Sequence, residues 1–136
     1  MPETLKTYLF IALGSALGGV GRFWIGGWVA ERMTKTIFPW NTLVVNVTGS
    51  FVIGILGALT ATEGKLLGPN LRSFLYYFLM IGVCGGYTTF SSFSLQTLNL
   101  VRDGQWFYVF GNIIASVVVC LIAVWLGFLL GQILNR

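Results

Sequence analysis

Histidine is absent from this chain, and charged residues are scarce. The 136 residues include eight Lys and Arg and four Asp and Glu, so that only 9% of the chain is charged, against about 25% in an average soluble domain. This composition excludes an ordinary soluble protein. Without histidine or paired carboxylates, the usual acid, base and nucleophile arrangements have no candidates, and we expect a protein that is not an enzyme.

Cysteine is also scarce. Cys84 and Cys120 both fall within apolar stretches, away from any Cys or His cluster, so we interpret them as small core residues and not as a disulfide or a metal site. The net charge of +4 could favour nucleic acid, but the basic residues are scattered singly, which is typical of anchors at a membrane surface. We expect a lipid bilayer as the partner, and no nucleic acid.

Long hydrophobic runs are abundant, and 56% of the residues are hydrophobic. Four runs reach the roughly 20 residues that a spanning helix needs. A signal peptide after Lys6 is a weaker alternative, because the first run continues past the possible cleavage region to Val29. We predict an all-α membrane protein with a single domain over residues 1–136. The four transmembrane helices are expected at Thr7–Val29, Thr42–Ala61, Phe74–Leu100 and Trp106–Ile133, with polar links at Glu31–Lys35, Glu63–Asn70 and Arg102–Gln105.

Positive charge is divided almost evenly between the two sides of the predicted bundle. The side with both termini and the second link has Lys6, Lys65, Arg72 and Arg136, and the other side has Arg32, Lys35 and Arg102. Because this difference gives the positive-inside rule little to act on, we expect insertion in both orientations. Opposite copies could then pair as an antiparallel homodimer about an axis in the membrane plane. The alternative is that a few basic residues suffice to set one orientation.

Small residues recur every fourth position on the first two spans. This pattern lets helix backbones approach closely, so we expect tight helix packing or dimerisation. The small residues are Gly14 and Gly18, Ser15 and Gly19, and Ser50, Gly54 and Ala58.

The run from Gly85 to Ser94 interrupts the third span. The paired glycines Gly85 and Gly86 carry a high entropy cost in a helix, and Thr88 and Thr89 have hydroxyls that can bond locally to the backbone. Irregular backbone within a bilayer survives only where protein or a polar pathway satisfies it. We therefore predict a broken third helix that takes part in ion handling.

Phe90 and Phe93 share one face of the helix that follows this break. The positive edges of two aromatic rings could contact an anion, and neighbouring serines add hydrogen-bond donors. The alternative is that both rings face lipid or fill the core. The break also frees carbonyl oxygens, which suit a hard cation such as Na⁺.

Two spans each have a stripe of polar residues. Hydroxyl and amide donors suit a desolvated anion that must bind and then leave, whereas the alternative is hydrogen bonding that only holds the helices together. Asn46 is the hardest to explain in that second way, because an amide at membrane depth has donors and an acceptor to satisfy. The stripes are Thr42, Asn46 and Ser50 on the second span, and Tyr108, Asn112, Ser116 and Cys120 on the fourth.

Carboxylates are missing from the middle of every predicted span. Glu3, Glu31, Glu63 and Asp103 lie at the amino terminus or at span ends. None of them could carry protons for coupled export, so we favour passive flow of an ion. A coupled exporter and a purely structural membrane subunit remain the alternatives.

Three segments of the chain resemble the Fluc/CrcB family of fluoride channels. They are Gly-Gly-Val-Gly-Arg at 18–22, Asn-Thr-Leu-Val-Val-Asn-Val-Thr-Gly-Ser-Phe at 41–51, and Gly-Gly-Tyr-Thr-Thr-Phe-Ser-Ser-Phe-Ser at 85–94. The resemblance covers nearly the whole chain, and the Thr-Thr-Phe-Ser-x-Phe-Ser motif is its most specific part. It implies a passive fluoride channel that exports cytoplasmic fluoride through the plasma membrane of a bacterium and so reduces fluoride toxicity. It also implies a dual-topology antiparallel homodimer with two pores and a broken third helix.

The resemblance implies roles for individual pore residues. Phe90 and Phe93 would contact fluoride, with Asn46 beside them as a pore-lining donor. Asn112 stands where serine is commoner in the family, and Gln96 falls where some relatives carry glutamate. The polar track would continue through Thr42, Tyr108, Asn112 and Ser116.

The resemblance also implies a structural Na⁺ at the dimer interface. The backbone carbonyls of Gly85 and Thr88 would bind this ion, two from each subunit. Arg22 would lie at the vestibule or at the dimer interface.

Overall fold

Apolar helices make up most of residues 2–61 and 67–135, the parts of the chain that the computed structural model describes. Within these residues, four helical segments, the third composite, are each long and apolar enough to cross a membrane: Glu3–Arg32, Trp40–Thr60, Pro69–Arg102 and Trp106–Leu134. The four predicted spans are therefore confirmed, and the protein is an all-helical, multi-pass membrane protein. The elements in chain order are α1 (Glu3–Arg32), α2 (Trp40–Thr60), α3 (Pro69–Phe74), the π-helix η1 (Leu75–Cys84), α4 (Gly85–Tyr87), α5 (Phe90–Arg102) and α6 (Trp106–Leu134).

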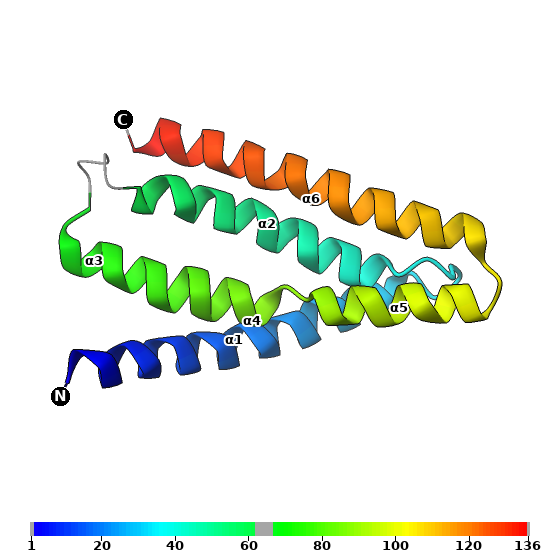
Figure 1. Ribbon diagram of the computed structural model, residues 1–136, viewed down its shortest axis with the longest axis horizontal. Coiled ribbons are helices and arrows are strands. Elements are labelled where there is room, and N and C mark those ends of the chain that lie inside the picture. The colour runs from blue at the N-terminus through cyan, green and yellow to red at the C-terminus, as the bar shows by residue number, and fades with distance from the viewer. Residues whose placement is uncertain (1, 62–66, 136) are drawn as a thin grey trace.

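The helices lie roughly alongside one another, along the long axis of the molecule (Figure 1). α2 packs mainly against α6, and α1 packs mainly against η1 and α4. The first turn of α1 and the last turn of α6 lie at one end, and the links at residues 33–39 and 103–105 lie at the other (Figure 1). This arrangement agrees with an even number of crossings.

The residue bounds predicted for the polar links between the helices are wrong at several ends. Glu31 still belongs to α1, Asn70 to α3 and Arg102 to α5. The helices continue past the apolar runs because a spanning helix can extend beyond the hydrocarbon core into the polar interface. Within the second link, Glu63 and Lys65 lie outside the described residues, as does the terminal Arg136.

Glycines allow the backbones of neighbouring helices to touch. A Cβ atom at Gly18 of α1 would lie 2.8 Å from the backbone nitrogen of Tyr87, and one at Gly54 of α2 would lie 2.9 Å from that of Phe128. These approaches are too close for any larger residue. The predicted tight packing is confirmed at both sites, which join α1 to the third span and α2 to α6. Gly19, in contrast, has open space beside it.

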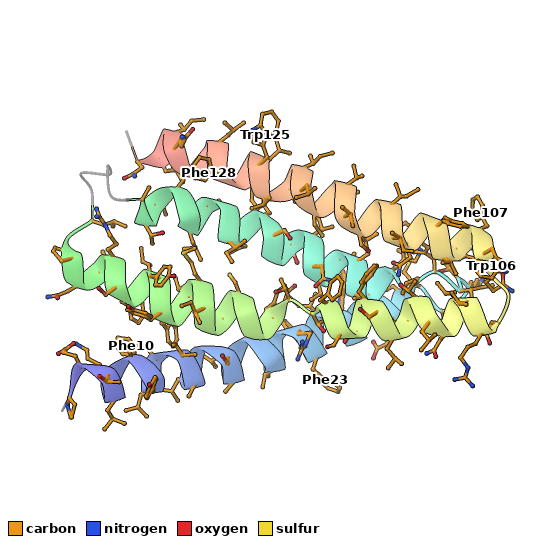
Figure 2. The ribbon with its side chains drawn as sticks, in the orientation of Figure 1. Phe10, Phe23, Trp106, Phe107, Trp125 and Phe128 are labelled. Atoms are coloured by element: carbon orange, nitrogen blue, oxygen red, sulfur yellow. The ribbon has the colours of Figure 1, made fainter. Side chains whose placement is uncertain are left out.

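Large apolar side chains cover much of the outer surface. Phe23 is 84% exposed and Trp125 is 60% exposed, and Figure 2 shows both pointing away from the bundle. The buried residues are mostly smaller, such as Val45 and Ala58. An apolar exterior of this extent fits a molecule whose surroundings are themselves apolar.

A tight turn joins α5 to α6 and brings their side chains together. Gly104 has φ 68°, a left-handed conformation that glycine adopts without strain. Its N–H donates to the carbonyl of Val101, and the N–H of Gln105 donates to the carbonyl of Leu100, at 3.0 and 2.9 Å. This pair of bonds is the Schellman motif, which ends α5 and turns the chain directly into α6.

Candidate functional site

Two extended residues, Thr88 and Thr89, separate α4 from α5. Their backbone angles are φ −78°, ψ 155° and φ −151°, ψ 113°. The sequence interpretation of the paired glycines as helix breakers is wrong, because Gly85 and Gly86 are both helical. Gly86 packs instead against α1, where a Cβ atom would lie 2.8 Å from the Cα of Ser15. The preceding η1 is also not the regular α-helix expected there, since a π-helix bonds residues five apart.

Asn46 on α2 bonds to the backbone of Thr89 in both directions. Its Oδ1 accepts from the N–H of Thr89 at 2.7 Å, and its Nδ2 donates to the carbonyl of Thr89 at 3.0 Å. The side-chain amide thereby supplies the two hydrogen bonds that this extended residue lacks from the helix. One Nδ2 hydrogen is still available for a further acceptor.

The Thr89 side chain begins α5. Its Oγ1 accepts from the N–H of Ser92 at 3.1 Å, which is the usual geometry of an N-cap. The hydroxyl groups of Ser91 and Ser92 also lie 3.1 Å from this oxygen. A cluster of hydroxyl groups therefore surrounds the amino end of α5, where the helix dipole favours negative charge.

A recess of about 430 Å³ lies on the α1 side of Thr89. We call it the α1-side recess. Of the residues that the structure describes, one cation lines it, Arg22, whose Nη1 lies 3.4 Å from the carbonyl oxygen of Thr88. Together with Thr89, its polar lining residues are Arg22, Asn41, Thr42, Ser92 and Gln96.

A second recess of about 440 Å³ lies on the α6 side of Thr89. We call it the α6-side recess. It brings the two predicted rings together with residues from both polar stripes, so α2, α5 and α6 all contribute to it. Its lining residues include Asn46, Ser50, Thr88, Thr89, Phe90, Phe93, Ser116 and Cys120.

Phe90 and Phe93 form a ring pair at the wall of the α6-side recess. Their centroids are 5.3 Å apart, and the ring planes are tilted by 46°. Phe90 is 78% exposed, and Phe93 is half-buried. A tilted, partly exposed pair presents ring edges, which carry the positive end of the aromatic quadrupole.

Not every predicted track residue lies with the rings. Thr42 is buried and lines the α1-side recess. Tyr108 lies outside both recesses, with its ring edge-on to Phe107. Asn112 is only 2% exposed and bonds to Thr97 and Ser116, so within one chain it joins α5 to α6 and does not line a recess.

The carbonyl groups of Gly85 and Thr88 lie at the interruption between α4 and α5. The N–H of Thr89 would serve the carbonyl of Gly85 in a continuous helix, but it donates to Asn46. The carbonyl of Thr88 faces Arg22 at the long distance of 3.4 Å, and a carbonyl has two lone pairs. Both oxygens are hard ligands of the kind that Na⁺ prefers, so the donor type fits the expected ion.

Sequence reasoning named the Thr89 hydroxyl as a local backbone partner, which is confirmed, but it did not identify Thr89 as a helix cap, and it missed Thr97. Thr89 lies directly before the serine-rich start of α5, and threonine there is a recognised sign of an N-cap. No pattern in the sequence singles out Thr97, because its contact with Asn112 depends on how α5 and α6 face each other.

A family model described as "CrcB-like protein, Camphor Resistance (CrcB)" matches residues 9–128 of this chain. A protein named "Fluoride-specific ion channel FluC" from Opitutus terrae is 57% identical over 132 residues, which are 96% of each chain. A protein of the same name from Methylocella silvestris is 55% identical over 130 residues, 95% of each chain. Another from Paramagnetospirillum magneticum is 50% identical over 97% of this chain and 100% of its own.

The matches with the relatives extend over nearly the full length of both aligned chains. They include the segments that form both recesses. The chain belongs to the CrcB-like family.

Proposed function

We propose that this protein is a passive, fluoride-selective ion channel that exports cytoplasmic fluoride. The observation that carries the proposal is the near full-length identity of 50 to 57% with proteins named fluoride-specific ion channels. The ring pair beside hydroxyl and amide groups supports it independently. Such a protein moves an ion and performs no chemical reaction, so it is not an enzyme.

The α6-side recess has the chemistry that fluoride needs. Fluoride is small and strongly hydrated, so a selective pore must replace its water with close, neutral donors. Asn46 has one unused N–H, and the edges of Phe90 and Phe93 are positive. Because no fixed cation lines this recess among the described residues, an anion could bind there without being trapped.

The pore itself would be completed by a second copy of the chain. Phe90 is 78% exposed, and both recesses are open on the surface of one chain, so a partner could close them. An antiparallel, dual-topology homodimer would do this twice and give two pores. Arg22 would then lie near the dimer interface, and Thr42, Tyr108, Asn112 and Ser116 would lie along the path of the ion. The extended residues Thr88 and Thr89 would form the break in the third transmembrane helix.

A structural Na⁺ at the dimer interface is a further part of the proposal. The exposed Gly85 and the neighbouring Thr88 would each offer a carbonyl oxygen, and the partner would supply two more. When bound, the ion would neutralise these four carbonyl dipoles where the two chains meet.

Fluoride export follows from weak-acid chemistry and the membrane potential. Hydrogen fluoride crosses membranes as a neutral acid and releases fluoride in a more neutral cytoplasm. An inside-negative potential drives the anion out, with about 2.3 kcal/mol per charge for each 100 mV. We place the channel in the inner membrane of a bacterium, where it would reduce fluoride toxicity.

Fluoride efflux from liposomes that contain the purified protein tests the proposal. We expect rapid fluoride release measured with a fluoride electrode, and no matching release of chloride. An exporter would instead require a proton flux coupled to its substrate, and a structural subunit would release neither ion.

Replacing both rings tests the role of the α6-side recess. We expect the double substitution Phe90→Ile and Phe93→Ile to lower fluoride flux about tenfold, if each positive ring edge contributes about 0.7 kcal/mol. Phe107→Ile is the matched control, because that ring is 84% exposed on α6 and lies outside both recesses. Flux in the double variant equal to that of the control would contradict the role of the rings.

A further inference from the structure

A chain of side-chain hydrogen bonds joins α6 to the helix that carries the two rings. The hydroxyl of Thr97 donates to the carbonyl of Phe93 at 2.7 Å. The Nδ2 of Asn112 donates to the Oγ1 of Thr97 at 2.9 Å, and the hydroxyl of Ser116 donates to the Oδ1 of Asn112 at 3.3 Å. The chain of bonds starts at Ser116 in the α6-side recess and ends on the backbone of a ring residue.

The carbonyl of Phe93, the last acceptor, fixes the donor and the acceptor in each of these three hydrogen bonds. A carbonyl can only accept, so the single hydroxyl proton of Thr97 is committed to Phe93. The Thr97 oxygen can then only accept from Asn112, which forces the amide to present its NH₂ group to Thr97. Its oxygen therefore faces Ser116. Because Asn112 is 2% exposed, water cannot easily supply substitute partners for a reversed amide.

We propose that Thr97 is a positioning residue for anion passage, acting through Asn112 on the hydroxyl of Ser116; this inference rests on the proposed function. In the fixed arrangement, Ser116 gives its only proton to Asn112 and turns its lone pairs toward the recess. An anion needs a donor, so Ser116 must first release Asn112. The 3.3 Å bond is longer than most hydroxyl bonds and is the weakest of the three. Thr97 thereby sets how readily Ser116 can donate to the ion.

Removing the Thr97 hydroxyl would release this constraint. With valine at position 97, the amide of Asn112 would lose its acceptor and would reverse, because an under-satisfied carbonyl oxygen is tolerated better than an orphaned N–H. Its NH₂ group would then donate to Ser116, whose own proton would be free to point into the recess.

Fluoride efflux at low fluoride concentration, from liposomes that contain each full-length variant, tests this inference. We expect Thr97→Val to raise the flux about two- to tenfold, the value of one net hydrogen bond. Thr97→Ser keeps the hydroxyl and is expected to behave as wild type. In a Ser116→Ala background the effect of Thr97→Val should vanish, because no hydroxyl is left to reorient. A merely structural role for Thr97 would not depend on Ser116.

The matched control is Thr60→Val on α2. Its hydroxyl also donates to a carbonyl one turn earlier at 2.7 Å, and its other contacts are with the carbonyl of Gly57 and the sulfur of Met80, so wild-type flux is expected. If Thr97→Val does not yield folded protein, Thr97→Ala also removes the hydroxyl that Asn112 donates to and is expected to raise flux. The inference is overturned if wild type conducts but flux is unchanged in Thr97→Val, or if Thr97→Val acts equally in Ser116→Ala. Absence of fluoride flux in wild type would instead refute the proposed function.

Discussion

The two parts of the third span are held in the bundle by different kinds of contact. Before the extended residues, η1 and α4 touch the backbone of α1 through Gly14, Gly18, Gly82 and Gly86. From Thr89 onward, α5 and its N-cap are joined to α2 and α6 by side-chain hydrogen bonds, including those of Asn46 with Thr89 and of Asn112 with Thr97. The first part depends mainly on shape, although the hydroxyl groups of Tyr87 on α4 and Thr48 on α2 also lie 2.9 Å apart, and the second depends on polar partners.

We call α1 together with η1 and α4, which contact it through backbone atoms, the scaffold. The polar groups around α5, in contrast, form a site that can be adjusted. Backbone contacts between glycines leave no space for movement and cannot be replaced by another pairing. A hydroxyl or an amide can exchange one partner for another, including an ion, at a cost of about 1 kcal/mol. The polar residues around the α6-side recess therefore lie where exchange of partners is possible, and they are held in place by the rigid part of the bundle.

Substitution in the scaffold should have the largest effect on stability. We expect Gly18→Ala to destabilise the protein by about 3 kcal/mol or more, because its methyl group would meet backbone atoms of Val83 and Tyr87 that cannot move aside. Thermal unfolding in detergent measures this. Gly21→Ala is the matched control on the same helix, since its methyl group would lie 3.7 Å from the Tyr87 ring, and it should be neutral or stabilising by about 0.5 kcal/mol. Equal stability of the two variants would remove the distinction between the two parts of the span.

Substitution of Asn46 should have an intermediate effect. We expect Asn46→Leu to cost about 2 kcal/mol, because it leaves the N–H and the carbonyl of Thr89 without their partners. Fluoride flux should also fall, since the amide donor is lost. Thermal unfolding and liposome efflux are the two measurements. Ser50→Ala, one turn along α2 in the same recess, is the control and should change stability by less than about 0.5 kcal/mol. Unchanged stability in Asn46→Leu would mean that Thr89 finds other partners.

Substitution of the Thr89 cap should have the smallest effect. We expect Thr89→Val to destabilise the protein by about 1 kcal/mol, because the N–H of Ser92 loses the Oγ1 that caps α5. Thr89→Ser keeps this oxygen and should retain most of the stability in the same thermal assay. A loss as large as that in Gly18→Ala would show that α5 is part of the scaffold.

The number and type of the helices could be predicted because they depend on composition. Runs of about 20 apolar residues have few alternatives to a spanning helix, and all four predicted spans appear at the expected positions. The resemblance in the segment Gly85–Ser94 was also recognisable from sequence, as were Phe90 and Phe93 as neighbours.

The local details of the site could not be predicted in the same way. Gly85 and Gly86 have the composition of a helix break, yet both are helical, and at Gly86 the missing side chain leaves room for the backbone of α1. Asn112 has the spacing of a pore residue, and only the structure shows that within one chain it is buried and donates to Thr97. Glycine permits both a break and a close contact, and an amide permits both a pore and a bridge.

The sequence by itself determined a four-helix membrane protein of the CrcB-like family, because apolar length and a specific motif are properties of the chain alone. Only the tertiary structure decided that Asn46 satisfies the backbone of Thr89, that Thr42 and Asn46 line different recesses, and that Thr97 orients Asn112. The physical reason is that hydrogen bonds are satisfied between helices far apart in the chain. Which partners meet depends on how those helices are rotated and packed against one another.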